Sequence, residues 1–328
     1  ESPLGWCSWY YYFTGVSEEA VLANLEILAG DPELTPLRIV QIDDGYQREI
    51  GDWLEPGERF PHGLAWLAGR IRERGFRPGL WLAPFLVGAR SRLYREHPDW
   101  LVREPDGSPA LALHNWEQEC YALDTTNPAA LAHLRRVIRT VGREWGIDYL
   151  KADFVYAAAI PGHRTDPGAT GAQAYRRGMA AIREEMGRGY LLGCGAPLGP
   201  SIGLVDANRI GPDVGPSWRH QTLDPTRPGA ESALRPLLTR SFVHRRWWLN
   251  DPDCVLLRAD ETDLNEEEVR TLATVIALSG GAVLLSDRLD RLPPERRSIL
   301  RSMLPAGLEG ALALDRKSTR LNSSHGII

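Results

Sequence analysis

The chain has 328 residues, of which 43% are hydrophobic and 25% are charged, a composition typical of ordinary soluble globular proteins. Its net charge of −5 comes without a basic block, which argues against nucleic acid as a partner, and no apolar run approaches the ~20 residues of a membrane span. The four Cys show no CxxC spacing, and the eight His form no HxH or HExxH pattern. We therefore expect no metal, no cofactor, no membrane partner and a cytoplasmic protein with reduced thiols.

The C-terminal end of the chain differs from the rest. Residues 315–328 begin with DRKSTRLNSSH, which back-translates naturally into a widely used sequencing adapter, and they show no hydrophobic periodicity. We interpret residues 315–328 as an artefact and residues 305–314 as the start of a truncated C-terminal region. Residues 1–304 are expected to form the folded unit. Because the first residue is not Met, we also expect truncation at the N-terminal end.

Short β-rich runs alternate with helical patterns along the folded unit, which is typical of a parallel sheet. The predicted strands are residues 5–9, 38–43, 78–83, 149–154, 190–194, 208–210, 247–249 and 282–286. The predicted helices are residues 18–28, 64–73, 128–145, 169–186, 230–243, 266–278 and 293–303. This alternation predicts an α/β fold, a (β/α)8 TIM barrel. A doubly wound open sheet is the alternative, disfavoured because no GxGxxG follows the first strand.

Carboxylates follow several of the predicted strands. The strand ends read QIDDGY (41–46), YLKADF (149–154), NRIGPD (208–213) and WWLNDPD (247–253). Catalytic groups of (β/α)8 barrels sit at the C-terminal ends of the strands, and a carboxylate beside an apolar barrel is costly unless it is paired or functional. We expect Asp253 to cap the following helix. The other acids are candidates for chemistry.

One lysine stands out in a chain that otherwise uses arginine. The chain carries 38 Lys and Arg residues, yet its only lysines are Lys151 and Lys317. Lys151 precedes Asp153 by two positions, so the two side chains are expected on the same face of a strand. A cation ~4–6 Å away holds an aspartate ionised, as a nucleophile requires.

Asp213 is the second candidate for the reaction itself. It follows Arg209 by four residues and lies between Pro212 and Gly215, which predicts a loop. A loop aspartate that is partly desolvated can hold its proton and act as a general acid. Two carboxylates facing each other across a pocket are what glycoside hydrolysis needs, and a spacing of ~5–5.5 Å implies retention.

Asp43 and Asp44 are adjacent at another predicted strand end, where such a pair can accept hydrogen bonds from neighbouring sugar hydroxyls. Trp9 and Trp81 also fall at strand ends, where flat apolar rings could wall the same pocket. These four residues predict a sugar-binding site.

Seven motifs follow one another along the predicted barrel: GWCSW (5–9), IDDGY (42–46), GLWLAP (79–84), YLKADF (149–154), CGAP (194–197), RIGPD (209–213) and WLNDPDC (248–254). In this order they resemble the barrel of glycoside hydrolase family 36. That family comprises retaining α-galactosidases, with the plant raffinose-type synthases as relatives. The resemblance covers residues 1 to about 304.

The resemblance implies roles for individual residues. Asp153 corresponds to the nucleophile and Asp213 to the acid/base. The substrate-binding residues that it implies are Asp43 and Asp44 for the galactose 4- and 6-hydroxyls, Lys151 for the 3- and 4-hydroxyls, Arg209 near the 2-hydroxyl, and Trp9, Trp81 and Cys194 along the sugar. A compact ammonium beside the nucleophile can bond two hydroxyls where the wider Arg fork would crowd the pocket.

The implied activity is the release of terminal α-linked galactose from melibiose- or raffinose-type sugars through a covalent galactosyl-enzyme, with the α-galactoside as small-molecule partner. The alternatives are a galactosyltransferase of the raffinose-synthase type and a non-catalytic sugar-binding relative. Two departures leave linkage and chain-length preference open: Tyr46 stands where relatives often have Trp, and residues 196–198 replace a Gly-rich turn. Family members usually carry flanking β-domains and can share active sites between subunits, so we expect a homo-oligomeric full-length form. Without those domains the chain is expected to be inactive or poorly soluble.

Overall fold

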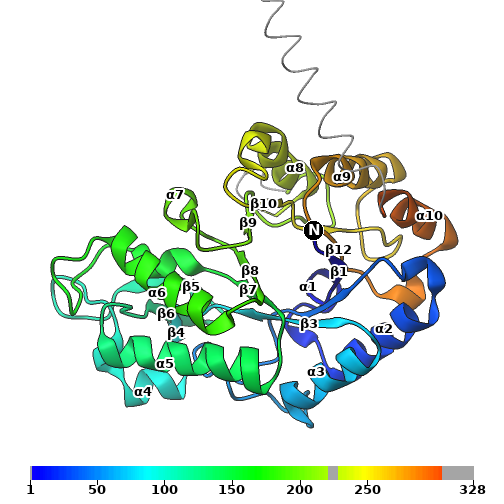
Figure 1. The fold of residues 1–328 in the computed structure, drawn as a ribbon. Coiled ribbons are helices and arrows are strands. Elements are labelled where there is room, and N and C mark those ends of the chain that lie inside the picture. The colour runs from blue at the N-terminus through cyan, green and yellow to red at the C-terminus, as the bar shows by residue number, and fades with distance from the viewer. Residues whose placement is uncertain (1, 221–227, 305–328) are drawn as a thin grey trace, which may run out of the picture.

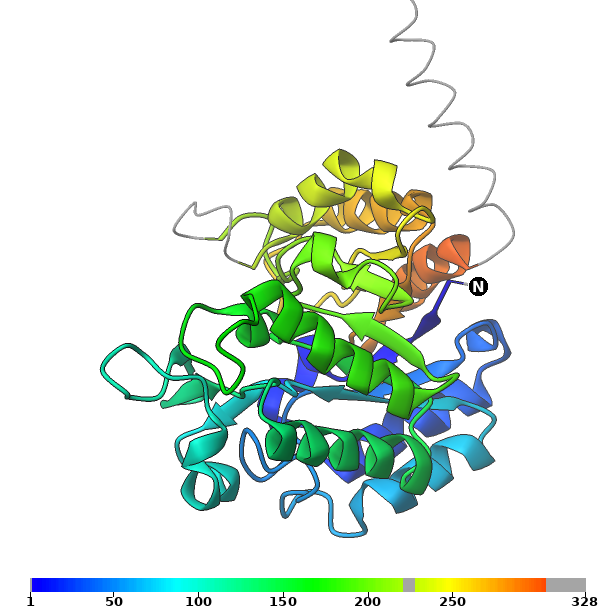
Figure 2. The same ribbon diagram turned by 60° about the vertical axis from the view of Figure 1, so that its left-hand side comes forward.

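The computed structural model describes residues 2–220 and 228–304. Within them, the main sheet is built from parallel strands: β1 (Leu4–Cys7), β2 (Ile39–Ile42), β3 (Arg77–Leu82), β7 (Tyr149–Ala152), β8 (Tyr190–Gly193), β9 (Ala207–Arg209), β10 (Leu249–Asp251), β11 (Cys254–Val255) and β12 (Val283–Leu285). The longer helices are α2 (Glu18–Gly30), α3 (Gly63–Glu73), α5 (Pro128–Arg139), α6 (Gly171–Met186), α8 (Ala230–Thr239), α9 (Glu266–Ser279) and α10 (Pro294–Met303). Figures 1 and 2 show these helices around the outside of the curled sheet.

The sheet closes on itself at β10 and β11. Its strand order is β10-β9-β8-β7-β3-β2-β1-β12-β11, and the two end strands are separated in the chain only by Pro252 and Asp253. Proline cannot donate to a strand ladder, and Asp253 has a positive φ of 75°, so the ladder breaks there. β10 and β11 are therefore two halves of one bent strand, and the predicted (β/α)8 barrel is confirmed.

The predicted strands are all present, with shifted ends. The predicted strand at residues 247–249 starts later, as β10, and resumes as β11 after the break. The strand predicted for residues 5–9 ends at Cys7, and Trp9 begins the short helix α1 (Trp9–Tyr12) instead. The placement of Trp9 at a strand end was therefore wrong.

Polar side chains fix where several helices begin. Ser17 accepts a hydrogen bond from the backbone N–H of Ala20 at the start of α2. Thr170 before α6 and Asn265 before α9 each form a reciprocal capping box with the residue three positions on. The helices predicted at residues 18–28, 169–186 and 266–278 are confirmed, and the residues that mark their starts are local in the sequence.

A second, three-stranded antiparallel sheet lies between β3 and α5 in the chain, and the sequence did not predict it. It contains β4 (Leu86–Gly88), β5 (Leu111–Asn115) and β6 (Gln118–Ala122) in the order β4-β6-β5, next to the short helix α4 (Arg92–Glu96). Figure 1 shows this sheet at the side of the barrel opposite α10. The turn between β5 and β6 carries Trp116 and Glu117, both with positive φ.

The segments assigned to a truncated region (305–314) and to an adapter (315–328) lie outside the described residues. Among the helices of residues 2–220 and 228–304, none combines the length and hydrophobicity required to cross a membrane.

Two glycines make a matched test of the close contact between β1 and β2. Gly5 in β1 pairs with Ile39, and a Cβ on it would lie 2.5 Å from the Ile39 carbonyl oxygen. Gly69 in α3 has nothing within 4 Å of the corresponding position. We expect Gly5→Ala to lower the free energy of unfolding by about 1–3 kcal/mol. Gly69→Ala should raise it by about 0.5–1 kcal/mol, since alanine favours helix.

Denaturant unfolding followed by circular dichroism measures both variants. Equal shifts of the two midpoints in the same direction would contradict the tight strand contact.

Candidate active site

Lys151 lies between two carboxylates that follow the C-terminal ends of β2 and β7. Its Nζ is 3.0 Å from Asp43 Oδ2 and 4.0 Å from Asp153 Oδ2. Asp43 directly follows β2 and Asp153 directly follows β7, with β3 between them in the sheet. Burial lowers the pKa of Lys151, but the nearby anions, Asp43 first, raise it well above its ordinary value. The lysine is therefore a fixed positive charge beside Asp153.

Asp153 is held by two further donors. Its Oδ1 accepts the backbone N–H of Phe154 at 2.7 Å, and its Oδ2 accepts the indole Nε1–H of Trp81 at 3.1 Å. The side chain keeps 14% of its surface exposed. Phe154 has a left-handed φ of 49°, which turns the chain sharply away after β7. An oriented carboxylate with a nearby cation and remaining access is suited to nucleophilic attack.

Asp43 is more deeply enclosed than Asp153. Besides Lys151, its Oδ2 accepts a hydrogen bond from Gln41 Nε2 at 2.5 Å, while its Oδ1 accepts the backbone N–H of Asp44 at 3.0 Å. Its own N–H donates to Ser8 Oγ at 2.9 Å. Asp43 therefore links β1, β2 and β7 around the lysine.

Asp44 accepts a hydrogen bond from Trp116, a residue with no predicted role. Trp116 Nε1 donates to Asp44 Oδ2 at 2.7 Å, and Gln47 Nε2 donates to Asp44 Oδ1 at 2.6 Å. Burial raises the pKa of Asp44 to about 6, although both hydrogen bonds lower it. Trp116 reaches the site only because the β5–β6 hairpin folds back over the barrel. No local pattern around Trp116 indicates this.

Aromatic rings line up beside these carboxylates. The ring centroids of Trp81 and Trp116 are 6.3 Å apart, and those of Trp116 and Phe154 are 5.5 Å apart. Trp53 packs edge-on against Trp81 from the other side at 5.8 Å. Flat apolar rings next to hydrogen-bonding carboxylates suit a ligand with both C–H faces and hydroxyls.

Arg209 forms the second charged cluster, at the end of β9. Its Nε is 2.7 Å from Asp251 Oδ2, its Nη1 is 3.0 Å from Asp213 Oδ1, and its Nη2 is 2.8 Å from Asp253 Oδ1. Burial lowers the pKa of the guanidinium, but Asp251 and Asp253 raise it well above its ordinary value. The arginine is thus permanently charged and bonded to three carboxylates.

Asp213 lies in the loop after β9, as the sequence predicted. Its side chain is 45% exposed, whereas that of its partner Arg209 is 5% exposed. The pKa of Asp213 is raised to about 6, first by desolvation and then by Asp253, while Arg209 and Lys151 lower it. A carboxyl with this pKa can hold a proton near neutral pH, as a general acid requires.

Asp253 does not cap a helix, so that prediction was wrong. The next helix, α9, begins at Glu266 and is capped by Asn265. Asp253 is instead buried at the break between β10 and β11, where it meets Arg209 and accepts hydrogen bonds from the backbone N–H of Val214 and from the Tyr10 hydroxyl.

Cys194 and Trp9, both predicted to lie along the sugar, have different positions relative to the carboxylates of the site. Cys194 is buried directly after β8; burial raises the pKa of its thiol well above the ordinary value, and Asp153, Arg209 and Lys151 act on it electrostatically. It therefore lies between the two charged clusters. Trp9 packs edge-on against Phe13 at 5.3 Å, and in the described part of the chain no hydrogen bond joins it to an aspartate.

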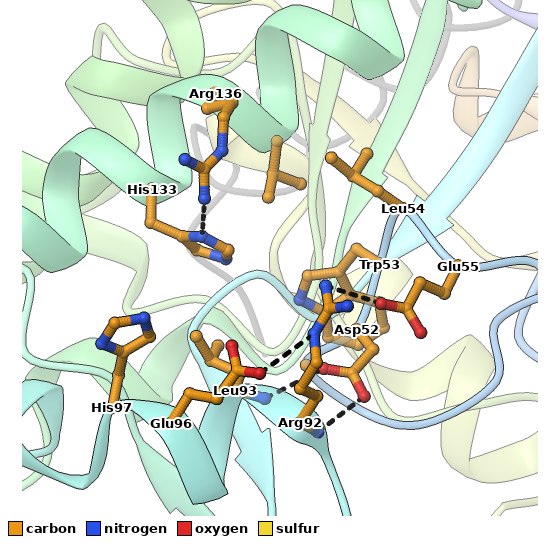
Figure 3. A pocket seen from close by; sticks show the side chains of 12 residues that line it. Asp52, Trp53, Leu54, Glu55, Arg92, Leu93, Glu96, His97, His133 and Arg136 are labelled. Atoms are coloured by element: carbon orange, nitrogen blue, oxygen red, sulfur yellow. Dashed lines mark hydrogen bonds and ion pairs between the residues drawn. The ribbon is translucent and has the colours of Figure 1, made fainter.

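A separate hollow of 260 Å³ lies between α4, α5 and the segment at residues 51–55, and Trp53, which packs against Trp81, lines it. Figure 3 shows Arg92 paired with Glu55 on one side and Arg136 bonded to His133 on the other. Burial lowers the pKa of His133 to about 4. None of the predicted site residues lines this hollow. Within residues 2–220 and 228–304, no group of three His, Cys, Asp or Glu is placed to hold a metal ion.

Comparison with known proteins relates the chain to one group of enzymes. Residues 38–189 match the model of the Melibiase family. An α-galactosidase from Thermus thermophilus, known in complexes with p-nitrophenyl α-D-galactopyranoside and with stachyose, is 42% identical with a TM-score of 0.83; the match covers 93% of this chain and 62–65% of the Thermus chain. The GH36 α-galactosidase AgaA from Geobacillus stearothermophilus is 20% identical with a TM-score of 0.67, over 98% of this chain and 42% of its own. α-Galactosidase 2 from Pediococcus pentosaceus is 28% identical over 46% of this chain.

The relatives are longer than this chain. The matched region spans 21% of the Pediococcus protein and less than two thirds of the Thermus one. The match to the Melibiase family model and the barrel fold both agree with the seven motifs that lie at the ends of the strands. The chain is therefore similar to part of these longer α-galactosidases.

Proposed function

We propose that the chain hydrolyses terminal α-galactosides with retention of configuration. The observation that carries this proposal is the contrast between two carboxylates at the same end of the barrel. Asp153 is oriented by Trp81 and lies near the cation Lys151. Asp213 has its pKa raised to about 6 by desolvation and by Asp253. Retaining glycosidases need such a pair, one ionised and one protonated.

In the first half-reaction, a carboxylate oxygen of Asp153 attacks the anomeric carbon of the galactoside. The bond from that carbon to the leaving oxygen breaks, and Asp213 gives its proton to that oxygen. The hydrogen bonds from Trp81 and from the Phe154 N–H hold Asp153 in one orientation for the attack. The products are a galactosyl ester of Asp153 and the released alcohol.

In the second half-reaction, Asp213 is a carboxylate and takes a proton from water. The water oxygen attacks the anomeric carbon, the ester bond to Asp153 breaks, and galactose leaves with its original configuration. Asp213 is suited to both steps because its pKa of about 6 lies near neutral pH. The ion pair between Arg209 and Asp213 keeps Asp213 at the rim of the site.

The other predicted residues are proposed to bind the sugar. These are Asp43 and Asp44 toward the 4- and 6-hydroxyls, Lys151 toward the 3- and 4-hydroxyls, Arg209 near the 2-hydroxyl, and Trp9, Trp81 and Cys194 along the ring. Arg209 has five N–H groups and three carboxylate partners, so donors remain for a hydroxyl. Trp116, bonded to Asp44, joins this group.

A galactosyltransferase would use the same covalent intermediate with a sugar in place of water, and a binding protein would use the pocket without turnover. Both Asp153 and Asp213 are present, which favours an enzyme over a binding protein. The direct test incubates the 328-residue chain, and a version extended at both ends, with p-nitrophenyl α-D-galactoside and its α-gluco, α-N-acetylgalactosaminide and β-galacto counterparts. We expect the extended version to release galactose from the α-galactoside, with the α-anomer appearing first by proton NMR, and the 328-residue chain to turn over little or none of it.

Turnover of the α-N-acetylgalactosaminide or of the β-galactoside alone would overturn the substrate assignment. Formation of longer sugars in preference to free galactose, when sucrose is added, would favour the transferase.

Replacement of Asp153 should remove turnover and leave the fold intact. Asp153→Asn is nearly isosteric and keeps an acceptor for the Phe154 N–H. We expect kcat to fall by at least about a thousandfold, because no covalent intermediate can form. The measurement is kcat on the aryl α-galactoside, with circular dichroism as the control for folding. A folded variant with wild-type kcat would exclude Asp153 as the nucleophile.

Replacement of Asp213 should act according to the leaving group. Asp213→Ala is expected to reduce kcat/KM on melibiose by roughly 10²–10⁴, since a poor leaving group needs protonation. An activated dinitrophenyl α-galactoside should lose far less. Equal losses on the two substrates would rule out the acid/base role.

The pH profile should report the raised pKa of Asp213. The general acid must carry its proton, so kcat/KM on melibiose should decline as the pH rises through about 6. Asp44 has a pKa of about 6 as well and provides the control. The decline should persist in Asp44→Asn and disappear in Asp213→Asn; the reverse pattern would assign it to Asp44.

A further inference from the structure

The carboxylate of Asp253 is surrounded by four hydrogen-bond donors. Oδ1 faces the Arg209 guanidinium at 2.8 Å and accepts the backbone N–H of Cys254 at 2.7 Å. Oδ2 accepts the backbone N–H of Val214 at 2.8 Å and the hydroxyl of Tyr10. The side chain is 1% exposed. A site with donors at both oxygens fits an ionised carboxylate, since an amide can accept at one position only.

These donors come from four separate parts of the chain. Arg209 is the last residue of β9, Val214 lies in the loop after it, Tyr10 belongs to α1, and Cys254 begins β11. Asp253 itself has a φ of 75°, which costs energy for a residue other than glycine and persists only where the surroundings fix it. The contacts with Arg209, Val214, Tyr10 and Cys254 therefore fix the position of the Asp253 side chain.

Two of the four contacts lead directly to Asp213. Val214 is the next residue in the chain, so its N–H bond to Asp253 fixes the backbone beside Asp213. Arg209 bonds Asp253 through Nη2 and Asp213 through Nη1, so the two carboxylates share one guanidinium. Neither contact touches a reacting atom, so Asp253 acts on the reaction through Asp213 or through Arg209, which is also proposed to bind the sugar.

Several charged side chains surround Asp213 and Asp253 and influence the charge of Asp213. Asp213 faces Asp253 between β10 and β11, Arg209 on β9, and Lys151 and Asp153 at the end of β7. On its other sides Asp253 adjoins Tyr10 and Asp251. The negative charge of Asp253 opposes that of Asp213 and offsets part of the field of Arg209.

We propose that Asp253 is a positioning residue for the acid/base: it anchors the Asp213 loop through Val214 and, by its charge on Arg209, helps Asp213 keep its proton. This inference rests on the proposed role of Asp213. Tyr10 contributes by donating to Asp253 and reducing its effective negative charge.

The test compares three single substitutions. Asp253→Asn removes the charge and places an NH2 group against donors. Tyr10→Phe keeps the carboxylate and removes one donor. Asp287→Asn is the matched control, because Asp287 is also a buried carboxylate near a strand end, bound to the N–H groups of Leu257 and Arg258 and paired with the Arg258 side chain. Within the described residues it has no hydrogen bond or ion pair with Asp213, Arg209 or Val214.

The readouts are the pH dependence of kcat/KM on melibiose and on a dinitrophenyl α-galactoside, and the carboxyl 13C NMR titration of Asp213, assigned with Asp213→Asn. In Asp253→Asn, the uncompensated Arg209 should lower the pKa of Asp213 by about one unit. The alkaline decline on melibiose then moves to lower pH, and melibiose loses more rate than the activated substrate. Tyr10→Phe should shift the pKa upward by less, and Asp287→Asn should leave it in place.

The opposite shifts separate an effect of charge from general loosening, which would move both variants the same way. If Asp253→Asn and Asp287→Asn titrate alike, the inference is wrong. If Asp253→Asn does not fold, Tyr10→Phe decides: an unchanged or lowered Asp213 pKa overturns the proposal. If the wild type releases no sugar from any α-galactoside, the proposed function fails, while the NMR titration still decides whether Asp253 controls Asp213.

Discussion

The mouth of the barrel depends on the buried guanidinium of Arg209. The strand ladder is broken between β10 and β11, and Arg209 binds a carboxylate on each side of the break, Asp251 and Asp253. It also holds Asp213 in the following loop. Breaking a buried ion pair from one side typically costs about 3–5 kcal/mol, because the remaining charge has no solvent to replace its partner. Closure of the fold and placement of Asp213 thus rest on the same side chain.

The two cations of the site perform different tasks. Lys151 is a point charge between Asp43 and Asp153, and it leaves Asp153 with one exposed edge. Arg209 is a planar fork whose separate N–H groups meet three carboxylates at once. Beside the lysine, Asp153 is oriented by two donors and keeps part of its surface exposed. Beside the arginine, desolvation and then the negative charge of Asp253 raise the pKa of Asp213, while Arg209 itself lowers it. The two carboxylates therefore have different surroundings.

The sequence predicted the barrel and most of the charged residues because their signals are local. Strand ends, helix caps and the spacing of Lys151 and Asp153 lie within a few residues of one another. Trp116 and Asp253 could not be predicted in the same way. Trp116 meets Asp44, 72 residues earlier, through a hairpin in an unpredicted sheet, and the Tyr10 partner of Asp253 lies 243 residues away. Such contacts depend on how the chain returns to itself, and the short motif WLNDPDC is equally compatible with a helix cap.

The pairing of the first strand with the last has a consequence for how the protein is made. β1 lies beside β12, and the Trp6 indole donates to the carbonyl oxygen of Asp287, 281 residues further along the chain. During synthesis from the N-terminus, β1 can pair with β2 early, but its other edge stays without a neighbour until almost the whole barrel has left the ribosome. An unpaired strand edge readily recruits other chains. The growing polypeptide therefore carries an unpaired edge of β1 for most of its synthesis, and during this time it can associate with other chains. The barrel closes only late, when β12 pairs with β1.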